Sequence, residues 1–117
     1  MRQVARRTDE PNPAPLTEPV FLILLSLVQT PMHGYALLKE IEHLSQGRVR
    51  LSTGTLYGAL RRLLNDGWIE RFELEDTSRE KQAYRLTSLG RRQVEMELDR
   101  IRHLARAAAA RLRMSEV

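Results

Sequence analysis

The sequence predicts a mainly α-helical fold with a small β-hairpin, arranged as a winged helix-turn-helix domain with a long C-terminal dimerisation helix. Between residues 17 and 67, apolar side chains recur at helical spacing in three short stretches separated by Pro, Gly and Ser. From residue 68 they alternate with polar side chains, as in half-buried strands. From residue 88 they recur every three or four positions, which is typical of a helix that pairs with another helix. Three helices, a hairpin and a last helix follow the chain order of a winged helix.

The composition restricts the class of protein. A hydrophobic fraction of 42% and a charged fraction of 29% are typical of a water-soluble globular chain, and 117 residues suffice for one core with an appendage. The absence of cysteine excludes disulfides, thiolate metal sites and cysteine nucleophiles, and it fits a reducing compartment. The most apolar stretch, Val20 to Val28, is too short to span a bilayer, which takes about 20 residues. We therefore expect a cytoplasmic protein with no membrane contact and no cofactor.

The chain divides by composition into four parts. Residues 1–15 are rich in arginine and proline and cannot bury a core, so they predict a flexible arm. Residues 16–87 form the predicted winged helix domain, residues 88–113 the dimerisation helix, and residues 114–117 a tail.

The first two helices are predicted from their end signals. Thr17 can cap a first helix that continues to about Thr30, where Pro31 stops it. His33-Gly34 opens a second helix, which ends at Ser45-Gln46-Gly47. Its apolar face at helical spacing consists of Tyr35, Leu38, Ile41 and either Leu44 or Ser45.

A third helix and a hairpin complete the predicted domain. Ser52 is a strong N-cap for the helix, and Gly67 can end it in a left-handed conformation. The helix is expected to bury a row of leucines: Leu56, Leu60, Leu63 and Leu64. Residues 68–75 and 82–86 are the two expected strands, with Trp68, Phe72 and Leu74 on one face of the first and residues 76–80 as the turn.

The last helix is predicted to pair two copies of the chain. Thr87 caps it, and it continues toward Arg113, which makes it about 35–40 Å long and longer than the domain can cover. Its apolar seam is expected to form a homodimer interface that contains Val94, Leu98, Ile101, Leu104, Ala105, Ala108 and Leu112.

The polar face of the third helix carries the functional signal. Gly54 and Gly58 lie on it, and each glycine inside a helix costs about 1 kcal/mol relative to alanine, which suggests close approach by another molecule. A DNA major groove rewards such approach, with hydroxyls and guanidinium groups available for phosphates and bases. The neighbouring candidates are Thr53, Tyr57, Arg61, Arg62 and Asn65. The alternative is a solvated face on which the glycines have no binding role.

Four segments resemble the PadR family of transcriptional regulators: His33 to Ile41, Leu51 to Leu63, Asp66 to Glu70 and Tyr84 to Gly90. The resemblance covers about residues 16–112. With one helix after the hairpin, the chain resembles the shorter members of the family, which have a single C-terminal helix. It implies that the third helix enters the major groove and that the hairpin lies against the DNA backbone or the minor groove. The DNA-facing set implied by it is Thr53, Gly54, Thr55, Tyr57, Gly58 and Arg61, with Arg79 and Lys81 carried over for the hairpin.

The hairpin departs from the family pattern. Residues 70–81 contain five acidic and three cationic side chains, a net charge of −2, which opposes attraction to phosphate. Some short members bind planar drugs between tryptophans at the dimer interface, whereas the only tryptophan of this chain, Trp68, lies at the base of the hairpin. That drug pocket is therefore not carried over.

Three interpretations of function remain open. The first is a DNA-binding regulator, expected to repress by binding an inverted-repeat operator as a homodimer. The second is a winged-helix protein–protein interaction module without DNA binding, which the acidic hairpin would suit. The third adds a small-molecule inducer, bound between the first and last helices. An enzyme is not expected, because His33, His43 and His103 lack spaced partners and no phosphate loop, nucleophile motif or metal cluster is present in the sequence.

Overall fold

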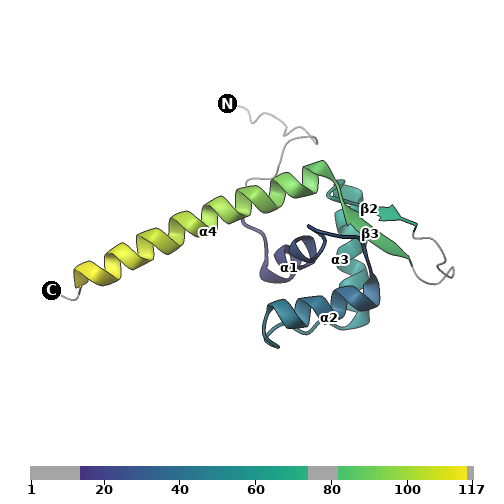
Figure 1. Ribbon diagram of the computed structural model, residues 1–117, viewed down its shortest axis with the longest axis horizontal. Coiled ribbons are helices and arrows are strands. Elements are labelled where there is room, and N and C mark those ends of the chain that lie inside the picture. The colour runs from purple at the N-terminus through teal and green to yellow at the C-terminus, as the bar shows by residue number, and fades with distance from the viewer. Residues whose placement is uncertain (1–13, 74–81, 116–117) are drawn as a thin grey trace, which may run out of the picture.

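The computed structural model describes residues 14–73 and 82–115. They form four helices and three strands (Figure 1), in the order α1 (Glu18–Ser26), β1 (Met32–His33), α2 (Gly34–Leu44), α3 (Thr53–Asp66), β2 (Ile69–Phe72), β3 (Ala83–Leu86) and α4 (Ser88–Ser115). The predicted order of three helices, a hairpin and a long last helix is confirmed. Among the described helices, none is long and apolar enough to cross a membrane.

The sheet has one strand more than the predicted hairpin. Its order is β1-β3-β2, and both pairings are antiparallel, so β3 lies in the centre. Met32 and Arg71 both lie opposite Tyr84, on either side of it. The sequence did not predict β1, because two residues directly before a helix are too few to show the alternation of apolar and polar side chains that indicates a strand. We call β2, β3 and the segment between them the wing.

The first helix ends earlier than expected, at Ser26 rather than near Thr30. The Ser26 hydroxyl donates to the Leu22 carbonyl at 2.7 Å, and the next two amides form bonds of the tighter three-residue spacing. The chain must then become extended to form β1, and a residue before proline disfavours the helical conformation. Pro31 therefore marks the farthest point that the helix could reach, and the helix ends before it, at Ser26.

The buried face of α2 is rotated by about one residue from the prediction. Gly34, Leu37 and Ile41 are buried, whereas Tyr35 is 70% exposed. Of the two alternatives for the last predicted position, Ser45 is buried and Leu44 is 39% exposed, and the predicted Leu38 is partly buried against the core. Because β1 fixes Gly34 against the domain at the start of the helix, the stripe that begins at residue 34 turns inward. The predicted inward orientation of Tyr35 was wrong, and Lys39 Nζ lies over its ring, 5.3 Å from the centroid.

The predicted caps are confirmed where they depend on local geometry. Thr17 Oγ1 accepts from the Val20 amide at 3.3 Å, and Ser52 Oγ accepts from the Thr55 amide at 3.1 Å. Gly67 ends α3 with φ of 78°. Thr87 Oγ1 accepts from the Gly90 amide at 3.0 Å and donates to the Gly67 carbonyl at 2.6 Å. Thr87 thus caps α4 and also ties its start to the end of α3.

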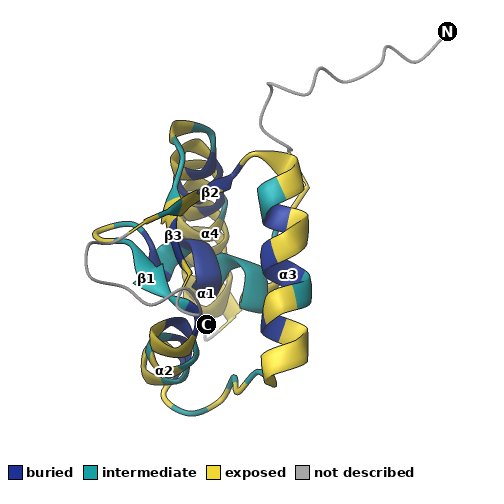
Figure 2. Cartoon of the chain, turned by 90° about the vertical axis from the view of Figure 1, so that its right-hand side faces the viewer, coloured by how far each residue is buried: buried dark blue, intermediate teal, exposed yellow. Residues whose placement is uncertain are grey.

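The core joins α1, α2, α3, the sheet and the first part of α4. α1 is central, and its Ile23 and Leu24 are fully buried. α3 buries Leu56, Leu60 and Leu63 as predicted, with Leu64 partly buried and Ala59 added to the buried row. The side of α3 away from the core is exposed along the helix (Figure 2).

α4 has 28 residues and extends away from the domain (Figure 1). Its buried residues, Gly90, Gln93, Val94 and Glu97, all lie in the first part of the helix. From residue 101 onward almost every position is exposed. The domain therefore covers only the beginning of α4.

Candidate nucleic-acid interface

The outer face of α3 presents the side chains that the sequence singled out. All eight predicted positions of this helix are exposed except Gly58, which is partly exposed. Ser52 Oγ also donates to Thr55 Oγ1 at 2.9 Å, so the capping pair fixes the Thr55 hydroxyl at the start of the helix. The amides of this first turn point outward along the helix axis, where the helix dipole favours an anion.

The two glycines of this face have free space beside them. A Cβ built at Gly54 meets no atom within 4 Å, and one built at Gly58 meets only Arg61 Nη2 at 3.9 Å. Packing within the chain therefore does not require glycine at either position, although Gly58 weakens the interior of the helix. The outer face of α3 is smooth at these two points and admits a closely approaching surface.

Tyr57 has a structural contact as well as an exposed edge. The Tyr57 ring lies so close to Gly34 that a Cβ at position 34 would collide with the Tyr57 hydroxyl. Tyr57 as a whole is still 37% exposed. Burial raises the pKa of Tyr84 above its ordinary value; the nearby Tyr57 adds to the rise, and Arg71 opposes it. Tyr57 thus connects α3 to the start of α2 and lies near the centre of the sheet.

The positive charge around α3 is smaller than the sequence suggests. Arg48 pairs with Glu18, and Arg50 Nε lies 3.1 Å from Glu42 Oε2. The run from residue 48 to 65 contains no acid, but the fold brings acids from α1 and α2 to its first two arginines. Arg61 and Arg62 have no acidic partner within residues 14–73 and 82–115.

The wing carries its described charges on two different faces. Arg85 Nε lies 2.7 Å from Glu70 Oε2, and its guanidinium stacks on Phe72 at 4.7 Å from the ring centroid. Arg71 Nε donates to Gln82 Oε1 at 2.8 Å. The hairpin candidates Arg79 and Lys81 lie outside the described residues.

A family model matches this chain over residues 23–96, more than half of its length, and describes the PadR-like family of transcriptional regulators. The chain belongs to the PadR-like family. The predicted resemblance is confirmed, and the class of the protein is that of a regulator, not an enzyme.

Several solved structures share the fold. A PadR family regulator from Clostridium difficile has a TM-score of 0.68 at 22% identity, covering 82% of this chain and 99% of that chain. RosR of H. salinarum has a TM-score of 0.61 at 26% identity, covering 81% of this chain and 94% of that chain. Bacillus subtilis PadR in complex with operator DNA has a TM-score of 0.62 at 22% identity, covering 73% of this chain and 48% of that longer chain. No curated protein matches the chain significantly.

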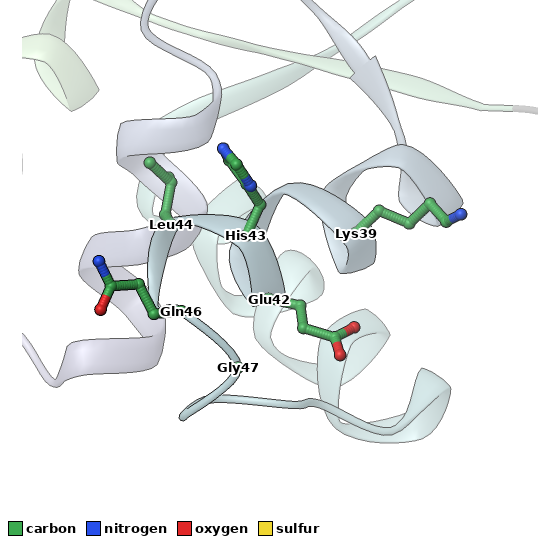
Figure 3. A pocket seen from close by; sticks show the side chains of 6 residues that line it. All are labelled: Lys39, Glu42, His43, Leu44, Gln46 and Gly47. Atoms are coloured by element: carbon green, nitrogen blue, oxygen red, sulfur yellow. The ribbon is translucent and has the colours of Figure 1, made fainter.

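This PadR-like protein also has a pocket of about 750 Å³ at the end of α2 (Figure 3). It is wide open to solvent, and its lining combines opposite charges with one apolar side chain: Lys39, Glu42, His43, Leu44, Gln46 and Gly47. The predicted inducer site between α1 and α4 is a different location. Within the described ranges, no group of three or more His, Cys, Asp or Glu side chains is placed to hold a metal ion.

Proposed function

We propose that this PadR-like protein is a sequence-specific DNA-binding transcriptional regulator that inserts α3 into the major groove. The observation that carries the proposal is the outer face of α3, where two glycines without a packing role lie between hydroxyl and guanidinium side chains. Without side chains at Gly54 and Gly58, the backbone of α3 can come close to base edges. Arg61 and Arg62, which have no described acidic partner, are free to contact a phosphate or a guanine.

A solved relative supports this use of the fold. Bacillus subtilis PadR was solved with operator DNA, and 48% of that chain is matched by this one. We propose the same class of ligand for the α3 face. The contacting set would be Thr53, Gly54, Thr55, Tyr57, Gly58, Arg61 and Arg62, with Tyr57 acting in part by holding α3 against α2.

We further propose that the protein acts as a homodimer through α4. The seam residues beyond the domain are exposed: Leu98 by 39%, Ile101 by 38%, Leu104 by 51% and Leu112 by 65%, together with Ala105 and Ala108. A helix with this apolar stripe exposed along its length is best covered by the same stripe of a second copy. Val94 is already buried in the core of its own protomer, so it would lie at the edge of the interface and contact the second copy little.

The dimer defines an expected mode of regulation. Two copies of α3 would enter successive major grooves of an inverted repeat, with centres about 34 Å apart. Repression would follow from occlusion of the promoter. The small-molecule inducer stays a prediction; it would act by changing the separation of the two α3 helices.

The decisive experiment is binding to DNA from upstream of the protein's own gene, at several salt concentrations and against a shuffled competitor. We expect the wild-type protein to prefer the upstream fragment and Arg61→Ala to weaken that preference. Arg106→Ala, which removes an exposed arginine from the side of α4 opposite the apolar seam, serves as a charge-matched control. Absence of binding even at low salt would overturn the proposal and favour a protein interaction module.

A further inference from the structure

We propose that Arg71 of β2 binds a DNA backbone phosphate, so that the wing contacts DNA at its base rather than at its tip. This inference rests on the proposed function of α3. It assigns a binding role to a residue that the sequence pattern did not single out.

The register of the sheet places Arg71 on the face that covers the core and α3. Arg71 lies directly opposite Tyr84, and Tyr84 lies opposite Met32 on its other side. Residues opposite each other on adjacent strands project to the same face, as do residues two apart on one strand. Ile69, two residues before Arg71, is 2% exposed and belongs to the core. Arg71 therefore continues a buried row outward to solvent along the edge strand β2.

The same row leads to the candidate interface. Met32 precedes Gly34 by two residues, and Gly34 contacts the Tyr57 ring of α3. Tyr57 and Arg71 both lie near enough to Tyr84 to influence its ionisation, in opposite directions. The Arg71 guanidinium is thus on the α3 side of the wing, next to residues that hold α3 in place.

The charge of Arg71 is available for an outside partner. Arg48, Arg50 and Arg85 each pair with a carboxylate, whereas the described partner of Arg71 is the neutral amide oxygen of Gln82. That bond engages Nε and orients the group, while a guanidinium has four more N–H donors on its two terminal nitrogens. A planar fork of this kind matches the oxygens of a phosphate.

The acidic composition of the hairpin explains why the base is the favourable contact point. Residues 70–81 have a net charge of −2, and three of the five acids lie beyond residue 74, toward the tip. Glu73 is exposed near Arg71 at the base, but these two described side chains form no ion pair. A wing tip of this composition gains little from a phosphate backbone. Glu70 is neutralised by Arg85 on the opposite face of the sheet, so it does not cancel the charge of Arg71.

The test compares four proteins on the upstream fragment and on unrelated DNA: wild type, Arg71→Gln, Arg71→Lys and Arg85→Gln. Arg71→Gln should raise Kd on both DNAs by a factor on the order of ten and lower the salt slope by about one per protomer. Arg71→Lys should retain most of the affinity, because it keeps the cation. Arg85→Gln removes the same charge from the opposite face, where it also leaves Glu70 unpaired, and should raise Kd much less than Arg71→Gln does.

Each remaining outcome overturns the inference in a recognisable way. If Arg71→Gln binds as wild type does, the phosphate contact is absent, although the proposed function of α3 stands. If Arg71→Lys is as weak as Arg71→Gln, the charge is not what binds. If only the preference for the upstream fragment is lost, Arg71 contacts a base. If wild type binds no DNA, the inference and the proposed function both fail.

Discussion

A methyl group added to each helical glycine would meet very different surroundings. At Gly90 it would collide with the Trp68 carbonyl oxygen, and at Gly34 with the Tyr57 hydroxyl. At Gly54 and Gly58 it would meet open space or an ordinary contact. Packing therefore requires glycine at two of these positions, Gly34 and Gly90, and does not require it at Gly54 and Gly58.

Gly58→Ala separates stability from binding at a single residue. Alanine should raise the free energy of unfolding by about 0.5–1 kcal/mol, because it restores helix propensity and clashes with nothing. The same methyl group should weaken binding to the upstream DNA by holding the α3 backbone away from base edges. Urea unfolding and DNA titration on one preparation measure both effects. A more stable variant with unchanged DNA affinity would remove Gly58 from the interface.

Gly90→Ala should act in the opposite direction. The added Cβ would press against the Trp68 carbonyl, which also accepts from the Thr87 amide at 3.1 Å and so has little freedom to move. Overpacking of this kind lowers the free energy of unfolding by about 1–3 kcal/mol. A shifted urea midpoint with an unchanged slope is the expected observation. Wild-type stability would mean that α4 can move away from the sheet without cost.

At the same scale, the sequence predicted interactions between near neighbours and missed those between distant ones. The caps at Thr17 and Ser52 were predictable, because a capping side chain and the amide it accepts from lie three residues apart. The ion pair of Arg48 with Glu18 joins residues 30 positions apart, and no local pattern indicates it. The exposed face of α3 was therefore predicted, whereas its reduced charge required the fold.

At the scale of elements, β1 shows what periodicity alone leaves out. Helical spacing on α2 allowed two adjacent stripes that share Ile41, and the stripe that begins at Tyr35 was the expected one. The two-residue strand Met32–His33 pairs with β3 and fixes the rotation of the helix that follows. Tertiary pairing thus decided an orientation that the amphipathic pattern left open.

A second connection between elements joins the N-terminal segment to α4. Glu97 is only 6% exposed; its carboxylate accepts from Arg100 Nε at 3.2 Å and from the Leu16 amide at 3.4 Å. The hydrogen bond from Arg100, the largest effect, lowers the pKa of Glu97 below its ordinary value, with the Leu16 amide acting in the same direction. Ionised Glu97 therefore stabilises the fold above its ordinary pKa, and this contribution is lost as the pH falls through the lowered value.

Glu97→Gln tests this connection. The variant should lose about 1 kcal/mol of unfolding free energy at neutral pH, because hydrogen bonds to a charged group are stronger than those to an amide. Below the ordinary pKa of glutamate, about 4.3, the two proteins should converge as wild type becomes protonated. Urea unfolding from pH 3 to 7 measures the difference. A constant gap across this range would show that packing, not charge, sets the effect.

At the scale of the whole molecule, α4 has one stripe with two environments. The buried residues Gly90, Gln93 and Glu97 and the exposed residues Ile101 and Leu104 fall on the same side of the helix at 100° per residue. The domain covers the first part, and the helix, about 42 Å long from its 28 residues, carries the rest beyond it. The sequence predicted this stripe but not the point at which the domain ends.

The double variant Leu98→Asp with Ile101→Asp tests whether a second copy covers the exposed part. Both side chains are more than a third exposed in the protomer, so the fold should survive while two carboxylates per helix disrupt the paired seam. We expect monomers in sedimentation, a retained helical signal and much weaker binding to an inverted repeat, since each monomer contacts only one half-site. His103→Asp with Arg106→Asp introduces the same residue at the same spacing on the opposite side of α4, and this control should remain dimeric. A dimer that persists in the first variant would place the contact between protomers elsewhere.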